Sequence, residues 1–375
     1  MLSMSLSPRE REILALLQAQ PMLDAAGLAR SLGTTKGAIA VALSSLSQKG
    51  EIVGRGYILR AEPWAVVVGG AAWDVKARSL AAARLHTSNP SQISRTPGGV
   101  GRNIAEGIAR LGGRVHLVAA VGADSAGQEL LALTAEAGVY VDQVARSPHP
   151  TGSYLAALDA DGELVIGLSD FAATDAMEVV SLSRAQELIS RADVVVVDGN
   201  IPVAVAEWVL ALVANADARV VVEPVSVAKA ARIAPLLVPE RPVFAVTPNV
   251  DELGSLVGHD VADTDADIAA AAAELHERGV QQVWVSRGMA GSVLISASGS
   301  VAIPAVPAEV ADVTGAGDAM TAGFVSGLLA GEDPAEAARH GHLAAALTVA
   351  SSHTVRPDLG VAFSAAFATT QGATL

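Results

Sequence analysis

The chain has 375 residues and a net charge of −14; 51% of its residues are hydrophobic, only 3% are aromatic, and none is cysteine. The missing cysteines exclude disulfides, thiolate metal sites and a cysteine nucleophile, and the negative charge argues against nucleic-acid binding by the chain as a whole. The length favours a large domain plus a small one, and without a signal-peptide pattern or an apolar run of about 18 residues we expect a cytoplasmic protein with no membrane span.

Residues 1–62 differ from the rest of the chain in charge. They hold seven Lys or Arg and five Asp or Glu, a net charge of +2, which leaves −16 for residues 63–375. Three short helices are expected here. The first has Ser7 as its N-cap and a proline at its first position, the second stops at Gly33, and the third runs from about Thr35 to Gly50. A short hairpin, Glu51–Arg60, follows them.

Three helices followed by a wing resemble the winged helix-turn-helix modules of transcription regulators. Phosphate contacts by Lys and Arg supply most of the affinity of such modules for DNA. The expected recognition helix offers only Lys36 and Lys49. The sequence therefore leaves two interpretations open for residues 1–62, which are weak or cooperative DNA binding and a docking or regulatory role.

From residue 63 onward, apolar strands alternate with helical patterns. A first strand begins at Trp64 and leads into a glycine turn, and further strands are predicted at Val115–Val121, Val194–Asp198, Val220–Glu223, Phe244–Thr247 and Val283–Ser286. The predicted helices are Asn103–Leu111, Gln128–Ala137, Val205–Ala214 and Asp265–Arg278. This alternation predicts an α/β domain over residues 63–375, with a parallel sheet covered on both faces. Ligands bind such sheets at the carboxyl ends of the strands, where the chain has Asp74, Asp198, Glu223, Asn249 and Arg287.

Two segments interrupt this alternation. Residues 75–97 and 151–170 carry little helical pattern and are predicted to form strands with turns, including a hairpin turn at Asp159–Gly162. We expect them to form a small second sheet over the strand ends, a lid that excludes water from the reaction.

Three short motifs outside the lid have a composition suited to ligand binding. Pro97–Glu106 is a glycine cluster that lets the backbone approach a ligand, although it is neither a dinucleotide fingerprint nor a Walker motif. Thr247–Glu252 places an amide and a carboxylate at the start of a helix, where a metal–phosphate could approach. Ser286–Gly291 is a glycine turn with a cation, suited to a nucleotide phosphate. Packing turns and helix caps are the alternatives for each.

Asp312–Asp318, with the sequence Asp-Val-Thr-Gly-Ala-Gly-Asp, is the most informative stretch. Its two glycines break a helix, so we expect a tight turn that presents backbone N–H groups at the N-terminus of the helix that follows, which makes an anion site. Asp318 then lies in the first turn beside the anion, where it could take a proton from an attacking hydroxyl. The helix N-terminus is expected to lower the pKa of this carboxyl. An ordinary helix cap is the alternative.

In this order and spacing, the motifs Gly98-Gly99-Val-Gly101-Arg-Asn103, Asn249-x-x-Glu252 and Asp312–Asp318 resemble those of the ribokinase-like sugar kinases, the pfkB family. The resemblance covers about Pro63 to Ala365. Within the family, the chain is most similar to the pseudouridine kinases, with which it shares the runs Ser88–Pro90, Thr151–Asp159 and Ala346–Val355. The resemblance implies a three-layer α/β/α domain with a small β lid, and some members also carry an N-terminal helix-turn-helix.

The resemblance also implies roles for individual residues. The activity would be ATP-dependent phosphorylation of the 5′-hydroxyl of pseudouridine, with Asp318 as the base and Gly315, Ala316 and Gly317 as the anion hole. Substrate contacts would come from Asp74, Ser88, Asn89, Gly98, Gly99, Asn103 and Tyr154. Nucleotide contacts would come from Asn249, Ser286, Arg287, Gly288, Gly291 and Thr314. Glu252 and Asp312 would lie near magnesium, and some members need a potassium ion near Asp312–Thr314.

Two alternatives to a pseudouridine kinase remain. One is a ribokinase or a purine nucleoside kinase of the same family, because the residues do not decide between bases. The other is a transcription regulator whose kinase-like domain only senses a nucleoside, although that reading predicts lost catalytic groups and Asp318, Asn249 and Glu252 are all present. An exposed lid edge would invite pairing between two copies, so we expect a homodimer.

Overall fold

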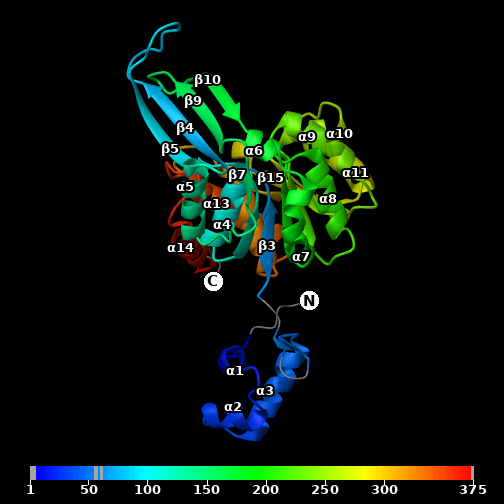
Figure 1. The fold of residues 1–375 in the computed structure, drawn as a ribbon. Coiled ribbons are helices and arrows are strands. Elements are labelled where there is room, and N and C mark those ends of the chain that lie inside the picture. Colours follow the sequence, from blue (N-terminus) through cyan, green and yellow to red (C-terminus); the bar gives the residue numbers. More distant parts are fainter. Residues whose placement is uncertain (1–5, 55–57, 60–61, 373–375) are drawn as a thin grey trace. The chain divides into compact units, whose positions relative to one another are not determined.

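The computed structural model describes residues 6–54, 58–59 and 62–372. The chain divides into two compact units, Met1–Glu62 and Pro63–Leu375 (Figure 1). No helix among the described residues combines the length and the apolar character needed to cross a membrane.

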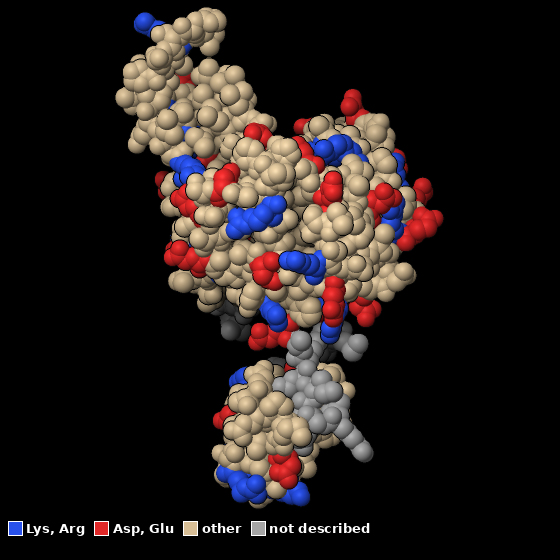
Figure 2. All heavy atoms as spheres, in the orientation of Figure 1, with Lys and Arg blue, Asp and Glu red and all other residues tan. Residues whose placement is uncertain are grey.

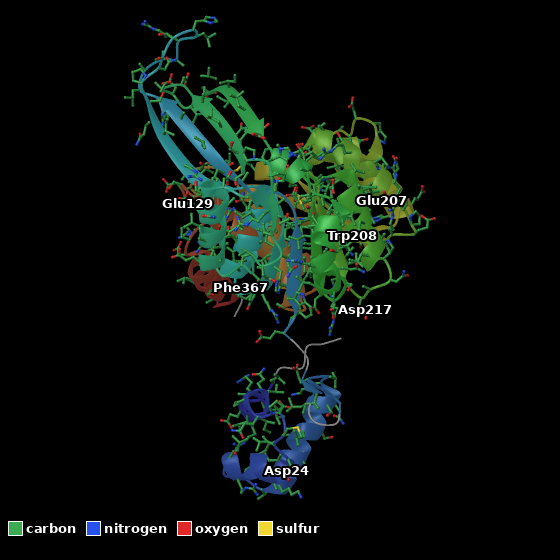
Figure 3. The ribbon with its side chains drawn as sticks, in the orientation of Figure 1. Asp24, Glu129, Glu207, Trp208, Asp217 and Phe367 are labelled. Atoms are coloured by element: carbon green, nitrogen blue, oxygen red, sulfur yellow. The ribbon has the colours of Figure 1, made fainter. Side chains whose placement is uncertain are left out.

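The first unit contains the three helices expected from the sequence: α1 (Pro8–Ala19), α2 (Ala25–Ser31) and α3 (Lys36–Gln48). The α1 helix begins with a capping box made by Ser7 and Glu10, and Asp24, labelled in Figure 3, caps α2. The antiparallel strands β1 (Ile52–Gly54) and β2 (Ile58–Leu59) follow. Residues 55–57 and 60 of the predicted hairpin lie outside the described residues.

One of the two lysines considered for DNA contact is tied into this unit. Glu10 is buried, and its carboxylate accepts hydrogen bonds from the Lys49 Nζ at 2.8 Å and from the Ser45 Oγ at 2.7 Å. These bonds lower the pKa of Glu10 to about 2, with the Lys49 bond as the largest cause. Lys49 therefore joins the end of α3 to Glu10 of α1. Its side chain is only 11% exposed.

An eight-stranded sheet forms the centre of the second unit, with strand order β16-β15-β14-β13-β12-β11-β3-β6. The strands from β14 to β6 run parallel, and β15 and β16 are antiparallel additions at one edge. The strands are β3 (Trp64–Val68), β6 (Arg114–Val118), β11 (Val194–Asp198), β12 (Arg219–Glu223), β13 (Val243–Val246), β14 (Val280–Ser286), β15 (Ser292–Ser296) and β16 (Gly299–Ile303).

Helices cover both faces of this sheet, as the alternating pattern predicted (Figure 1). One layer contains α7 (Gln186–Ser190), α8 (Val203–Val213), α9 (Val227–Ile233), α10 (Val250–Val257) and α11 (Asp265–Glu277). The other contains α4 (Val100–Arg110), α5 (Ser125–Glu136), α12 (Ala316–Leu329) and α13 (Pro334–Val349), with α14 (Leu359–Gly372) packed on α13 and α4. Shorter elements are α6 (Ala172–Asp175) and the 3-10 turns η1 (Val179–Ala185), η2 (Ala234–Leu236) and η3 (Gly288–Ala290).

One predicted strand is divided in the structure. The expected strand Val115–Val121 consists of β6 and a separate β7 (Ala120–Gly122), which leaves the central sheet to pair with β8 (Ala145–Ser147). The apolar run continues through both pieces because both are buried. Periodicity therefore gave no sign of the division.

The two segments predicted to form a lid do form a second sheet, of order β10-β9-β4-β5. It is built from β4 (Ala72–Ser79), β5 (Ser91–Gly98), β9 (Gly152–Leu158) and β10 (Leu164–Asp170). The predicted hairpin turn between β9 and β10 is present, with Gly162 at φ +93°. The base of the sheet is attached to α5, because Arg95 lies over the Trp73 ring and pairs at 3.0 Å with Glu129, which Figure 3 labels.

Candidate active site

The N-terminus of α12 has the tight glycine turn that the sequence predicted, with a difference in which backbone amides would be available to an anion. Gly315 is the N-cap at φ +81°, where a Cβ would lie 2.2 Å from the Thr354 carbonyl oxygen, so only glycine fits. The Ala316 N–H donates to the Val313 carbonyl at 3.2 Å. Within the described residues, the N–H groups of Gly315, Gly317 and Asp318 have no partner. These three amides are the ones free to bind an anion.

Asp318 has a raised pKa, which is the opposite of the expectation from the helix N-terminus. Burial raises the pKa of this carboxyl to about 7, and the charges of Asp198 and Asp74 add to the effect. A hydrogen bond from Asn103 and the charge of Arg102 act against it. The expected lowering was wrong because desolvation by burial outweighs the effect of the helix N-terminus on this pKa. Asp318 is therefore balanced between its two protonation states near neutral pH, as suits a general base.

A cavity of about 170 Å³ opens beside Asp318. Its lining is Val100, Glu223, Val225, Thr247, Asn249, Glu252, Trp284, Ser286, Gly317, Asp318, Met320 and Thr321. Glu223 is buried at the end of β12 and accepts hydrogen bonds from the hydroxyls of Thr247 at 2.7 Å and Thr321 at 2.9 Å. Burial raises the pKa of Glu223 to about 8, with smaller contributions from Glu252 and Asp318. Three carboxyl groups thus face one small cavity.

Asn249 and Glu252 form a capping box at the start of α10, which is the alternative that the sequence left open for them. The Asn249 Oδ1 accepts from the Glu252 N–H at 2.9 Å, and the Glu252 Oε2 accepts from the Asn249 N–H at 3.0 Å. Burial raises the pKa of Glu252. Both side chains also line the cavity, so capping holds them at its wall rather than excluding a role there.

The Ser286–Gly291 turn does not present its cation to the Asp318 cavity. Ser286 lines that cavity, whereas the Arg287 guanidinium pairs with Asp263 at 2.5 Å and with Asp265 at 2.6 Å. Gly288 and Gly291 have positive φ angles of +56° and +88°, as a tight turn requires. Arg287 therefore holds the turn against the start of α11 and lines a separate cavity of about 310 Å³.

Asp74, which the resemblance assigned to the substrate, lies inside lid strand β4 rather than directly after β3. It stands in register with Tyr154 of β9, so the two side chains share a face of the lid. Burial raises the pKa of Asp74, while the charges of Arg102 and Lys76 lower it. Gly98 leaves room for this carboxylate, because a Cβ there would lie 2.3 Å from the Asp74 Oδ2.

The glycine cluster at Pro97–Glu106 is a packing turn built around one buried carboxylate. The Asp198 Oδ2 accepts hydrogen bonds from the N–H groups of Gly70 and Gly101, both at 2.8 Å, and its Oδ1 accepts two from Asn200. Gly99, at φ +90°, leaves no room for a Cβ against the backbone of residues 70–72. The absent side chains of Gly98 and Gly99 thus face protein atoms. The turn brings Asn103 to Asp318, at 2.7 Å from Nδ2 to Oδ2.

Ser88 and Asn89 lie in the connection between β4 and β5, which extends away from the central sheet in Figure 1. The Asn89 side chain closes this connection on itself: its Oδ1 accepts from the Arg84 N–H at 2.8 Å and its Nδ2 donates to the Arg84 carbonyl at 2.9 Å. The structure therefore does not bring these two residues to the Asp318 cavity.

The two acidic residues predicted near a metal are in different surroundings. Asp312 accepts from the Lys76 Nζ at 2.8 Å and from the Thr314 N–H at 2.8 Å, so both of its oxygens are engaged. Glu252 keeps one oxygen without such a bond and shares its cavity with Glu223. No group of three or more metal-binding side chains occurs among the described residues. Magnesium often needs only one or two carboxylates besides the phosphates of its substrate, which fits Glu252 and not Asp312.

Several residues that shape this site were not assigned roles from the sequence. Asp198 and Glu223 were noticed at strand ends, and Arg102 was quoted inside the glycine motif, but no spacing rule connects them to Asp318. Lys76 of β4 pairs with Asp312, and nothing in the strand pattern indicated a partner 236 residues away. Thr321 is one helical turn after Asp318, a position that could have suggested a shared face.

Comparison with known proteins gives consistent results. The pfkB family of carbohydrate kinases matches residues 64–359. The chain is 36% identical to the pseudouridine kinase of Escherichia coli over 306 residues, which is 81% of this chain and 96% of that protein. It is 33% identical to an uncharacterized sugar kinase of E. coli, YeiI, over 94% of this chain and 96% of that protein, a span that reaches into the first unit. The structure of ribokinase from Arabidopsis thaliana, complexed with ribose and ATP, matches with a TM-score of 0.69 and 25% identity, covering 81% of this chain and 99% of that one.

The family match covers the second unit of the chain almost completely. The Asp318 carboxyl, the amides before it and the cavity beside them lie within the matched residues. The chain belongs to the pfkB family of carbohydrate kinases, and it is a phosphotransferase whose acceptor is the alcohol group of a sugar or nucleoside.

Proposed function

We propose that the protein transfers the γ-phosphoryl group of ATP to the 5′-hydroxyl of pseudouridine. The observation that carries this proposal is the 36% identity to a pseudouridine kinase over 96% of that protein's length. The chemistry of the site supports it, since a carboxyl of raised pKa lies beside unpartnered amides at a helix N-terminus. ATP is the expected donor for a member of this family, and the reaction needs a compartment that supplies it, so we place the protein in the cytoplasm.

In the proposed reaction, Asp318 takes the proton of the acceptor hydroxyl as the bond to phosphorus forms. The N–H groups of Gly315, Gly317 and Asp318 would bind the oxygens of the transferred phosphoryl group. Phosphoryl transfer has a loose transition state, so alignment and charge stabilisation supply most of the rate enhancement. Asp74, on the lid face above, would hold the ribose hydroxyls, and Asn103 would orient Asp318.

A divalent metal would be held at Glu252, where it would neutralise charge on the ATP phosphates. Asn249, Ser286 and Thr314 would contact the nucleotide, and the first two line the cavity beside Asp318. A potassium ion near the Asp312–Thr314 loop belongs to the proposal as well. Since Lys76 already places a cation there, we expect only a weak dependence on the monovalent salt, measured as turnover in potassium and in sodium buffers.

The test is an ADP-release assay with pseudouridine, uridine, adenosine, inosine, ribose and fructose as acceptors. Pseudouridine should give the highest kcat/KM, and Asp318→Asn should lower kcat about 10²–10⁴-fold while ATP still binds. Equal rates on ribose and pseudouridine would refute the narrower claim and favour a ribokinase, a reading that the match to the ribose complex also supports. Near-normal turnover by Asp318→Asn would refute the role of the base.

We further propose that the protein is a homodimer paired through the lid. Strand β10 is an edge strand, exposed along its whole length, and it carries Leu164, Ile166 and Leu168. The lid face visible in Figure 2 is mostly uncharged. A second copy would cover this apolar strand and its open edge. Light scattering should give twice the chain mass, and Ile166→Lys with Leu168→Lys should give the monomer mass; a monomeric parent would refute the proposal.

For the first unit we propose a winged helix-turn-helix that binds DNA weakly. Its three helices and short antiparallel pair support the assignment. Lys36 at the start of α3 is exposed, whereas Lys49 is committed to Glu10, so few phosphate contacts are available. The test is a mobility shift with duplex DNA at about 50 mM salt, with Lys36→Gln as the variant; no shift by the parent would favour a docking role instead.

A further inference from the structure

Arg102 is a charged side chain in the interior of the kinase unit, only 1% exposed, and it lies next to Asn103 on α4. Its guanidinium donates to the carbonyls of Gly98 at 2.9 Å and Pro97 at 3.1 Å. It also donates to the Glu106 carboxylate and to the Asn103 Oδ1. Arg102 therefore ties the end of lid strand β5 to the first turns of α4.

The contact with Asn103 determines which way that amide points. A guanidinium has only donors, so it requires the carbonyl oxygen of the amide to face it. The Asn103 NH₂ group is then turned to the other side, where its Nδ2 lies 2.7 Å from the Asp318 Oδ2. Because that oxygen accepts a hydrogen bond, Asp318 is left with its Oδ1 to receive a proton from an acceptor hydroxyl.

Arg102 is also a cation among the described groups that interact electrostatically with Asp318. The others are Asp74 from β4, Asp198 from the end of β11 and Glu223 from β12. The charge of Arg102 lowers the pKa of both Asp318 and Asp74, against the effect of burial. Without it, these carboxyls would be protonated to a higher pH.

We propose that Arg102 is a positioning residue for phosphoryl transfer, which acts through Asn103 to hold one oxygen of Asp318 in a hydrogen bond and leave the other free for the acceptor hydroxyl. The inference rests on the proposed role of Asp318 as the base. Arg102 itself touches neither the cavity beside Asp318 nor the amides of α12 within the described contacts. Its effect is therefore expected in kcat and in the pH profile, and not in the KM for ATP.

The test is a double-mutant cycle in kcat between Arg102→Lys and Asn103→Leu. Lysine keeps the charge but cannot reach all four acceptors, so the Asn103 amide loses its fixed orientation. Each single variant should lower kcat about 10–100-fold, with the KM for ATP unchanged, because misplacing a catalytic group by about 1 Å has this size of effect. If Arg102 acts through Asn103, the double variant should be no slower than the slower single variant.

The pH profile supplies a second readout, and a matched control comes from the same helix. Asn103→Leu removes a bond that lowers the pKa of Asp318, so its activity should fall off at a higher pH than that of the parent. Arg110→Lys makes the same chemical change at a residue that also pairs with Glu106 but has no bond to Asn103. It should leave kcat and the pH profile unchanged.

Three results would overturn the inference: an unchanged kcat in Arg102→Lys, losses that multiply in the double variant, and an equal loss in Arg110→Lys, which would indicate general damage to α4. Thermal melting of each variant shows whether the fold is intact. The Asp318→Asn variant separates this inference from the proposed function. An active Asp318→Asn would refute the role of Asp318 as the base. An inactive Asp318→Asn, together with losses in kcat that multiply in the double variant, would refute only the positioning role of Arg102.

Discussion

The raised pKa of Asp318 makes the rate of phosphoryl transfer sensitive to pH in the neutral range. An ordinary aspartate, with a pKa of 3.8, would be ionised throughout the working range of the enzyme. Burial places the pKa of Asp318 at about 7. Since only the ionised form accepts a proton, we expect the activity to fall as the pH is lowered through 7.

The size of the effect follows from that pKa. Half of the Asp318 carboxyls are ionised near pH 7, about a tenth at pH 6 and about a hundredth at pH 5. The value of kcat/KM should therefore fall about tenfold for each pH unit below 7. A carboxyl at 3.8 would give a flat profile over the same range.

The assay is direct measurement of ADP by chromatography between pH 5 and 9, which avoids coupling enzymes with pH profiles of their own. Glu223→Gln serves as the control, because Glu223 faces the same cavity and has a pKa of about 8. The acid limb should stay near pH 7 in this variant. A limb near pH 4 in the parent would refute the desolvation argument, and a limb that disappears in Glu223→Gln would assign the titration to Glu223.

Three further predictions concern stability and coupling. Gly315→Ala should lower the free energy of unfolding, measured by urea titration, by about 1–3 kcal/mol, because its positive φ and the nearby Thr354 carbonyl exclude a Cβ. Gly317 has open space where a Cβ would lie, so Gly317→Ala should change the free energy of unfolding by less than about 0.5 kcal/mol but should lower kcat. Equal destabilisation would contradict this account. Burial raises the pKa of Glu223 from 4.5 to about 8, so its contribution to stability is complete below pH 4.5 and is lost as the pH rises through 8. The melting temperature of Glu223→Gln should therefore fall less between pH 5 and 8.5 than that of the parent. Parallel melting curves for the two proteins would exclude the raised pKa. In a double-mutant cycle of unfolding free energies, Lys76→Met and Asp312→Asn should show a coupling energy of at most about 1 kcal/mol that weakens in high salt, because both side chains are partly exposed. A larger coupling energy that resists salt would contradict this prediction.

Much of the fold was predictable because the signals were local. The strands of the central sheet are apolar runs bounded by glycine or polar residues, and β11, Val194–Asp198, has the predicted ends. The lid strands were recognised by the absence of a helical period. The division between β6 and β7 was not predictable, since a single apolar run continues through both and only tertiary pairing separates them.

The site was predictable where one motif contained the whole feature. The glycine turn before Asp318 is such a case, because an N-cap glycine and an acidic first turn are visible in seven residues. The pKa of Asp318 was not, since it depends on burial by the folded chain and then on the charges of Asp198 and Asp74, which are far away in the sequence. Likewise, Arg287 was predicted at a phosphate, but its partners are Asp265 at the start of α11 and Asp263 just before that helix, and no spacing rule indicated them.

The buried Asp198 carboxylate also has a consequence for how the protein folds. It accepts the Gly70 N–H across 128 residues and the Gly101 N–H across 97 residues. Contacts between residues so distant in sequence form late, because the chain entropy of closing the loop is lost first. Until β11 docks beside β3, both glycine turns lack their common acceptor. A nascent chain that ends before residue 198 therefore contains both glycine turns and Asn103, but it lacks the carboxylate that joins the two turns and the Asp318 to which Asn103 donates.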